Sequence, residues 1–467
     1  MTPYNASLLA GLFMAAYVPL TLVFDATMSR QRAVLFSMLL AVMFMPFVSI
    51  DLGGFVEFNR ATALTIAVFF GVLLRDPERV FDFRPRWIDL PILIYCLVPI
   101  GTSVVNGLGL YDGLSGVLKQ VLRFGGPYFI GRLFFTHAEH RRLLVRAVVF
   151  GALIYVPFCL WEIRMSPQLH KQVYGFYQHE FVQTIRGSSY RPMVFMQHGL
   201  MVAMWIAGGA LFAAMMRVNR DPLRLFGFGW GTAAAGLAVV SVLMSSLGAT
   251  LLLFTFVGTI WFVRAARVRW PLYLLLFLPL VWVAGRTTGY LDDQRLAEAV
   301  AQVHPDRARS FASRLYTEDV LVQNTWRSPL LGLGTWGDDR TIMVDGQEEY
   351  VVVDGLWILA FSRYGVIGLL AILSVYFFPA FRVLRRTRPQ DWSTRPDHGV
   401  CAALALLLTM VAIDNLMNAM LNAVWLAIAG ALANTDGDEP EEFELQGARG
   451  LDEQPVFPHV LGQPRAY

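Results

Sequence analysis

Charged residues are scarce in this chain. Only 16% of its 467 residues are Asp, Glu, Lys or Arg, whereas 56% are hydrophobic and the mean hydropathy is +0.50. Soluble domains carry about 25% charged residues, and a soluble protein this apolar would expose large hydrophobic patches and aggregate. The composition therefore excludes an ordinary soluble domain and predicts an integral membrane protein.

Cysteines and processing signals are scarce as well. Cys96, Cys159 and Cys401 all fall within apolar runs and no C-x-x-C pattern occurs, which excludes a disulfide framework and a cysteine-based zinc site. The N-terminus lacks the basic segment and the small-residue cleavage site of a removable signal peptide. No internal repeat is visible, although a transporter built from two related halves would show one.

Apolar runs of about 18–22 residues recur along residues 1–434, each long enough to cross about 30 Å of hydrocarbon as a helix. Inside lipid only helices and closed barrels satisfy every backbone group, and the alternating strands of a barrel are not seen. We predict an all-α integral membrane protein with about 12–13 transmembrane helices, the last two expected spans being either separate or one broken helix. The expected spans are residues 5–24, 33–50, 61–75, 88–105, 114–135, 144–162, 193–216, 227–246, 248–264, 270–285, 356–381, 399–416 and 418–434.

Basic residues set the expected orientation. Arg residues gather in the loop after every odd-numbered span, whereas the short loops after spans two, four and eight are nearly free of Lys and Arg. Because basic loops stay in the cytoplasm, we expect the N-terminus and the even-numbered loops to face outward. The basic loops contain Arg30, Arg32, Arg75, Arg79, Arg84, Arg86, Arg141, Arg142, Arg146, Arg217, Arg220, Arg224, Arg264, Arg267, Arg269, Arg382, Arg385, Arg386, Arg388 and Arg395.

Two segments on the expected outer side are long, residues 163–192 and 286–355. The second, an extracytoplasmic loop before the last two or three helices, contains arginines but no lysine. This composition is compatible with bidentate recognition of phosphate or carboxylate, although for most of these arginines a solvated loop of Arg–Asp pairs is the favoured interpretation. The acid pairs Asp292–Asp293 and Asp338–Asp339 complete no ligand set, so we expect neither a metal nor another cofactor. Residues 435–467 are acidic and are expected to form a disordered tail.

Two glycine motifs border this loop. Residues 328–334 read SPLLGLG and residues 364–369 read YGVIGL; upstream, Arg314 precedes the first motif and residues 190–192 read YRP before Phe195. In order and spacing these features resemble the O-antigen ligase/polymerase family of bacterial surface polysaccharide synthesis, over residues 185–375. The chain departs from the family pattern at Asp354 and Gly355, where the family has His-Asn, and at residues 245–248 (SSLG), where an Arg is missing.

The resemblance implies a glycosyltransferase of the bacterial inner membrane, with an active site facing the periplasm. The implied donor is an oligosaccharide on undecaprenyl pyrophosphate and the acceptor is a growing polysaccharide (polymerase) or lipid A core (ligase). Polymerase ranks first because the ligase-like His and Asn are absent. The implied partners are membrane lipid and a chain-length regulator, with no nucleic acid. The alternative of another class is a flippase or other transporter of lipid-linked oligosaccharides.

The resemblance also nominates site residues. Arg191 and Arg314 match the family's arginines and would contact the pyrophosphate, the alternative being a salt bridge in a loop. Asp354 matches the position of the general base, although an Asp there is also a routine N-cap. His198, expected one turn into span seven, is a second candidate base, the alternative being a helix–helix hydrogen bond.

Span five supplies two further candidates from its charge alone. Lys119 and Arg123 are four residues apart and would share one helix face. Cations inside a membrane are costly and therefore candidates for binding the pyrophosphate, unless span five is an interfacial amphipathic helix. Asp414, Asn418 and Asn422 have the same spacing and are expected to join helices by hydrogen bonds.

Overall fold

The computed structural model describes residues 6–51, 57–187, 189–303, 305–334, 341–344, 347–350 and 353–435, and most of these residues are helical. The described strands form three two-stranded antiparallel hairpins: β1 (Ser49–Asp51) with β2 (Glu57–Asn59), β3 (Ile185–Arg186) with β4 (Ser189–Tyr190), and β5 (Thr341–Val344) with β6 (Gln347–Tyr350). Asp338, Asp339 and the acidic tail from residue 436 onward lie outside the described residues.

Within the described part of the chain, eight helices are long and apolar enough to cross a membrane. Their exposed faces carry large apolar side chains such as Leu251 and Trp261, which lipid can cover. The chain is therefore a multi-pass membrane protein that is mainly helical. The eight are α1 (Leu8–Thr27), Trp87–Val105 (the 3-10 turn η1, Trp87–Asp89, and α5, Leu90–Val105), α8 (Ala138–Met165), α10 (Gly199–Val218), α12 (Leu247–Ala266), α13 (Trp270–Thr287), α16 (Leu356–Arg386) and α17 (Pro396–Asp414).

The other expected spans also fall on helices, but these are shorter. They are α2 (Arg30–Phe44), α3 (Arg60–Arg75), α11 (Trp230–Leu243) and α18 (Ala423–Leu432). Span five is divided into α6 (Leu110–Gln120), a π-helical turn η2 (Val121–Gly125) and α7 (Gly126–Phe134). The last two spans are separate helices, because residues 415–422 between α17 and α18 are not helical.

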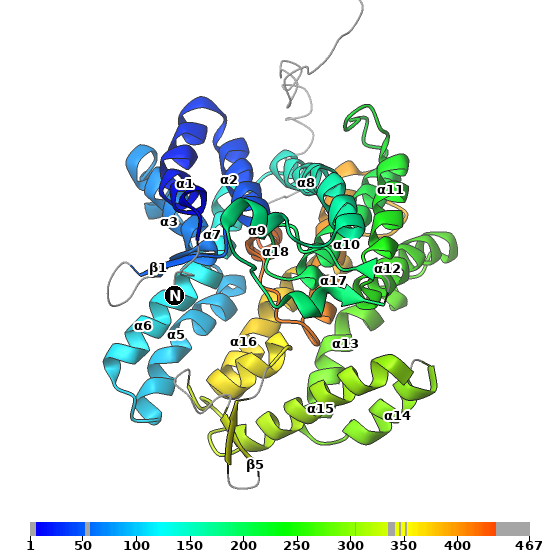
Figure 1. Cartoon of the computed structure of the whole chain (residues 1–467). Coiled ribbons are helices and arrows are strands. Elements are labelled where there is room, and N and C mark those ends of the chain that lie inside the picture. Colours follow the sequence, from blue (N-terminus) through cyan, green and yellow to red (C-terminus); the bar gives the residue numbers. More distant parts are fainter. Residues whose placement is uncertain are drawn as a thin grey trace, which may run out of the picture.

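The basic loops meet at one end of the helix bundle. Arg142 pairs with Asp397 at 3.2 Å and Arg146 pairs with Asp221 at 2.6 Å, so three loops that are distant in sequence touch there. Arg386 Nη1 donates to the carbonyl oxygen of Thr435 at 3.1 Å, which places the end of α18 at the same end. In Figure 1 the turn between α1 and α2 lies at the top of the view. Two helices of the 286–355 segment, α14 (Asp293–Val303) and α15 (Pro305–Thr325), lie at the bottom with β5.

Helices α10, α17 and α18 form the centre of the bundle. The apolar window of α10 is 89% buried, far more than that of the peripheral α1 at 22%. Helix α18 crosses α7 closely enough that a Cβ at Gly131 or Gly430 would overlap the opposite backbone. Small residues permit such contact between membrane helices. This close crossing fixes the start of α18, whose N-terminus borders the cavity described below.

Candidate functional site

The two glycine motifs pack directly against each other. The N–H groups of Leu333 and Val366 donate to the carbonyls of Ser362 and Pro329, both at 2.8 Å. Gly365 interrupts α16 with a φ of +62°, and a Cβ there would lie 2.4 Å from the carbonyl carbon of Leu330. Only glycine combines this backbone conformation with so close a contact. The motifs therefore join the loop to the first half of α16.

Arg314 and Asp354 form an ion pair at the start of α16. Nε of Arg314, on α15, lies 2.8 Å from Oδ2 of Asp354, and both side chains are about one-third exposed. The N-cap of α16 is Gly355 and no side-chain cap bond is made there, so the alternative role of Asp354 as N-cap is wrong. Nη1 of Arg314 also reaches the carbonyl of Met417 at 3.4 Å. The pair therefore lies beside the break between α17 and α18.

A buried ion pair holds α15 in place. Arg286, at the end of α13, donates through Nε to Glu318 at 3.2 Å and through Nη2 to the carbonyl of Leu315 at 2.8 Å. Glu318 also accepts from the indole N–H of Trp357 on α16 at 3.2 Å. Burial raises the pKa of Glu318 to about 7 despite the nearby Arg286. Because Glu318 is one helical turn from Arg314, this pair fixes the part of α15 that carries Arg314.

Arg191 lies in the segment before α10, which begins at Gly199 rather than at residue 193 as predicted. A carboxylate on α8, Glu162, accepts from the N–H groups of Met193 and Val194 at 2.8 and 2.7 Å and so keeps residues 193–194 out of the helix. Arg191 is buried, donates to the carbonyl of Ser245 at 3.1 Å, and fills the space that a side chain at Gly199 would need.

His198 caps α10, so the prediction that it lies one turn inside span seven is wrong. Its Nδ1 accepts the N–H of Leu200 at 3.1 Å, which puts the ring proton on Nε2. Burial, together with the nearby His179, Arg191 and Arg314, lowers the pKa of His198 to about 3. The imidazole is therefore neutral at physiological pH and presents an N–H donor at Nε2. This geometry does not suit a general base.

Four of the predicted residues thus belong to one group. Arg314 pairs with Asp354, and both Arg314 and Arg191 act electrostatically on His198. They come from three separate regions of the sequence. The group combines two cations, a carboxylate and a neutral N–H donor, which can bind an anion and accept a proton.

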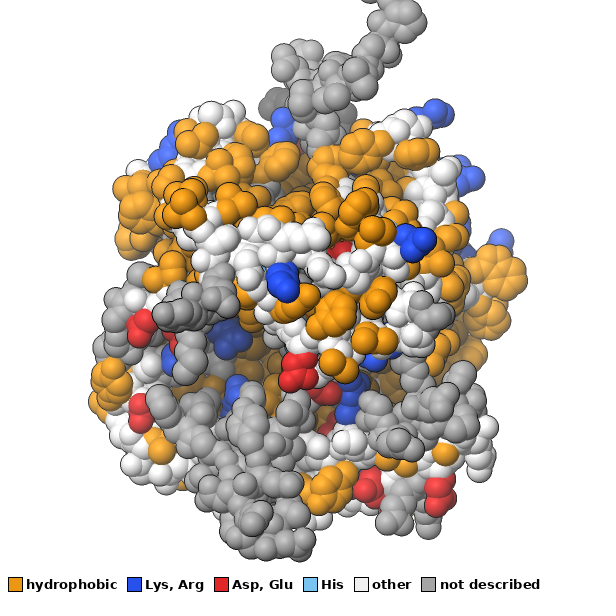
Figure 2. Space-filling model, in the orientation of Figure 1, with side chains coloured by type: hydrophobic (Ala, Val, Ile, Leu, Met, Phe, Trp, Pro, Cys, Tyr) orange, Lys and Arg blue, Asp and Glu red, His pale blue; other side chains and the backbone are white. Residues whose placement is uncertain are grey.

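Arg123 lies elsewhere, in a cavity of about 320 Å³ next to this group. Lys119 and Arg123 are both exposed, but only Arg123 lines the cavity. Arg123 lies in the π-helical turn that begins at Val121, whereas Lys119 belongs to α6. Figure 2 shows a recess containing Lys and Arg side chains below the apolar upper part of the molecule. The cavity is lined by Val42, Phe47, Val48, Ser49, Glu57, Asn59, Arg60, Ala61, Arg123, Gln197, Met201, Leu421, Asn422 and Ala423.

Sequence reasoning missed the other charged and amide side chains of this cavity. Arg60 opens α3, and its Nη1 donates to the carbonyl of Phe195 at 2.6 Å. A cation in the first turn opposes the helix dipole, so Arg60 was detectable as an unfavourable residue. Asn422 was assigned to helix joining together with Asp414 and Asn418. Asn418 does bond to Asp414 at 2.8 Å, whereas Asn422 caps α18 and lines the cavity.

The chain was compared with protein-family models and with curated proteins, and neither comparison gives a match. The site must therefore be interpreted from its own chemistry.

Proposed function

We propose that this protein polymerises lipid-linked oligosaccharide repeat units by glycosyl transfer at the outer leaflet of a bacterial inner membrane. The observation that carries the proposal is that the Arg314–Asp354 pair, beside the break between α17 and α18, lies near enough to His198 to act on it electrostatically, as Arg191 also does. The resemblance to the family identified each of these residues as a candidate. The two glycine motifs on which the resemblance rests are in direct contact.

The proposed topology has the N-terminus outside, about thirteen crossings and the 286–355 segment in the periplasm. It is supported by the contacts among the basic loops at one end of the bundle, whereas α14, α15 and β5 lie at the other end in Figure 1. Short helices such as α3 and α11 cross in this arrangement with the help of neighbouring loop residues.

In the proposed reaction the bond between the reducing-end sugar carbon and the pyrophosphate oxygen breaks. A bond forms from that carbon to a hydroxyl oxygen of the acceptor, and the hydroxyl proton passes to a base. Arg191 and Arg314 stabilise the negative charge on the leaving undecaprenyl pyrophosphate. Asp354 accepts the proton through Oδ1, because Oδ2 is held by Arg314.

A deletion strain distinguishes polymerase, ligase and flippase. Loss of a polymerase leaves single lipid-linked repeat units that a membrane-impermeant reagent can oxidise from outside. Loss of a ligase leaves long lipid-linked chains, and loss of a flippase leaves single units that the reagent cannot reach. We expect the first pattern, with restoration of polymer by the wild-type gene. Normal polymer in the deletion strain would refute the proposal.

A further inference from the structure

Three helices begin at the cavity around Arg123. The first residues of α3 and α18 line it, and so does Gln197, two residues before α10 begins. Each helix N-terminus carries a partial positive charge and points backbone N–H groups outward, which favours an anion. The cavity lies at the end of the bundle opposite to the basic loops, since α3, α10 and α18 all run from it toward those loops.

The cavity also contains more hydrogen-bond donors than acceptors. Asn422 is 2% exposed, and its Nδ2 has no hydrogen-bond partner among the described residues. The same holds for Nη2 of Arg60. Arg123 lines the cavity with an exposed side chain and makes no ion pair or hydrogen bond with the part of the chain that the structure describes. The carboxylate in the lining, Glu57, already accepts from Ser49 and Asn59 at 3.1 and 3.4 Å.

Such an arrangement is unfavourable without a ligand. A buried donor without a partner, such as Nδ2 of Asn422 or Nη2 of Arg60, costs about 1–3 kcal/mol. The missing partner must therefore supply acceptor oxygens and negative charge. The cavity volume of about 320 Å³ lies within the range of small-molecule sites.

We propose that this cavity binds an oxyanion, either a phosphate group or the carboxylate of an acidic sugar. Gln197 lines the cavity and the next residue, His198, belongs to the Arg191–Arg314–Asp354 group. Provided that the proposed function holds, the cavity is a second anion site for the same lipid-linked substrate. It holds either the carrier phosphates or an acidic sugar of the repeat unit while the first group carries out the transfer.

Binding to the full-length protein in detergent tests this directly, without any turnover. Tm is measured with inorganic pyrophosphate, glucuronate or glucose, with sodium chloride matching the ionic strength. We expect at least one oxyanion to raise Tm by about 1–3 °C at a tenfold excess over Kd, and glucose to have no effect. A response to pyrophosphate assigns the site to the carrier, and a response to glucuronate assigns it to an acidic sugar.

Three variants test whether the shift in Tm comes from binding in the cavity. Arg123→Gln should abolish the shift. Ala61→Phe keeps both arginines but fills the cavity, and it should abolish the shift as well. Arg327→Gln changes an exposed arginine outside the cavity and should keep it. The proposal is overturned if neither oxyanion stabilises the wild type, or if the shift survives both cavity variants. Either result would leave the polymerase proposal standing, because no polymer is measured.

Discussion

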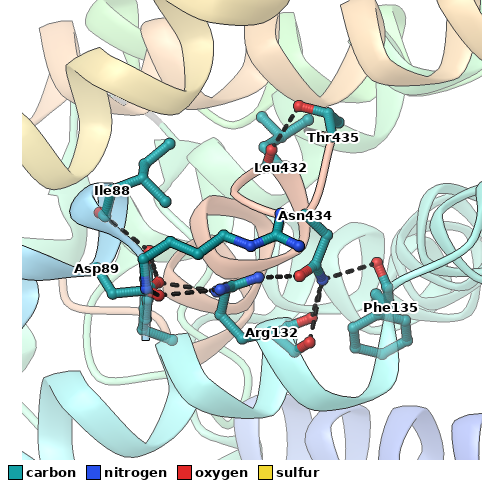
Figure 3. Close-up of polar contacts among 10 residues, drawn as sticks. Ile88, Asp89, Arg132, Phe135, Leu432, Asn434 and Thr435 are labelled. Carbon is teal, nitrogen blue, oxygen red and sulfur yellow. Dashed lines mark hydrogen bonds and ion pairs between the residues drawn. The ribbon is translucent and has the colours of Figure 1, made fainter. Parts of the chain in front are cut away.

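Arginines occupy two contrasting sites in this molecule. At the basic-loop end, Arg132 donates through Nε and Nη2 to both oxygens of Asp89, at 2.8 and 2.9 Å, and through Nη1 to Asn434 (Figure 3). Tyr128 gives Asp89 a further hydrogen bond at 2.8 Å. In the cavity at the other end, Arg123 and Nη2 of Arg60 have no such partners among the described residues.

The contrast separates a buried, paired arginine from cavity arginines that have no carboxylate partner and are less buried. Asp89 is fully buried and Arg132 is 5% exposed, so each would be very unfavourable without the other. Their pair joins η1, α7 and the end of α18, which is a structural role. The cavity arginines join no helices through a carboxylate, and their charge is available to a ligand. Pairing with a carboxylate therefore distinguishes Arg132 from the arginines that we propose bind an anion.

The largest effect is expected at the paired site. Arg132→Met leaves the Asp89 carboxylate buried without its partner, and we expect a loss of about 3–5 kcal/mol of stability. The double change Arg132→Met with Asp89→Asn should recover much of this loss. Thermal unfolding in detergent measures both. If the single variant is as stable as the wild type, Arg132 is not a structural arginine and the contrast fails.

The pair Arg314–Asp354 lies between the two extremes, since it is paired but about one-third exposed. Removing an exposed pair costs at most about 1 kcal/mol, whereas removing a general base slows a reaction by about 10²–10⁴-fold. We therefore expect Asp354→Asn to insert and fold normally but to make little or no polymer in the deletion strain. Asp25→Asn, which breaks an exposed pair with Arg75 at the basic-loop end, is the matched control. Near-normal polymer with Asp354→Asn would exclude Asp354 as the base.

Replacing the cavity residue Arg123 should have the opposite pattern of effects to replacing Arg132: little change in stability and a large loss of polymer. Arg123→Gln removes no ion pair, so Tm should stay close to that of the wild type. Loss of one charge-assisted contact with substrate corresponds to about 1.5–3 kcal/mol, and polymer formation should fall about ten- to a hundredfold. Lys119→Gln, four residues away and outside the cavity, should have a much smaller effect. Equal effects of the two variants would mean that lining the cavity gives Arg123 no special role.

The sequence predicts the helices better than their ends. Apolar length and the alternation of basic loops place a helix at every expected span, because both reflect the membrane itself. The start of α10 was missed since it depends on Glu162, whose three hydrogen bonds to backbone N–H groups are tertiary contacts. Periodicity could not predict that Arg123 lines a cavity while Lys119 does not, because a π-helical turn leaves no clear sequence signal.

The site was predicted in part, for a related reason. Short sequence motifs lie beside Arg191, His198, Arg314 and Asp354, and such motifs can be recognised from the sequence alone. The cavity depends on the meeting of three helix starts, so Arg60 and Gln197 belong to no motif. Their roles follow only when α3, α10 and α18 are placed together.

The smallest effect on polymer formation is expected from a substitution at His198. This side chain avoids the cost of a buried charge by staying neutral. Its pKa of about 3 lies below the ordinary value of 6.5, so between these values the folded state binds fewer protons than the unfolded state. Its contribution to stability is therefore present above about pH 6.5 and is lost as the pH falls toward 3.

His198→Asn keeps the cap, because the Asn oxygen replaces Nδ1 as acceptor for Leu200 N–H and the amide still offers a donor. We expect polymer formation within about threefold of the wild type and no change in its pH profile between pH 6 and 8. An inflection near neutral pH that disappears in His198→Asn would show instead that the imidazole titrates during the reaction, and His198 would replace Asp354 as the base.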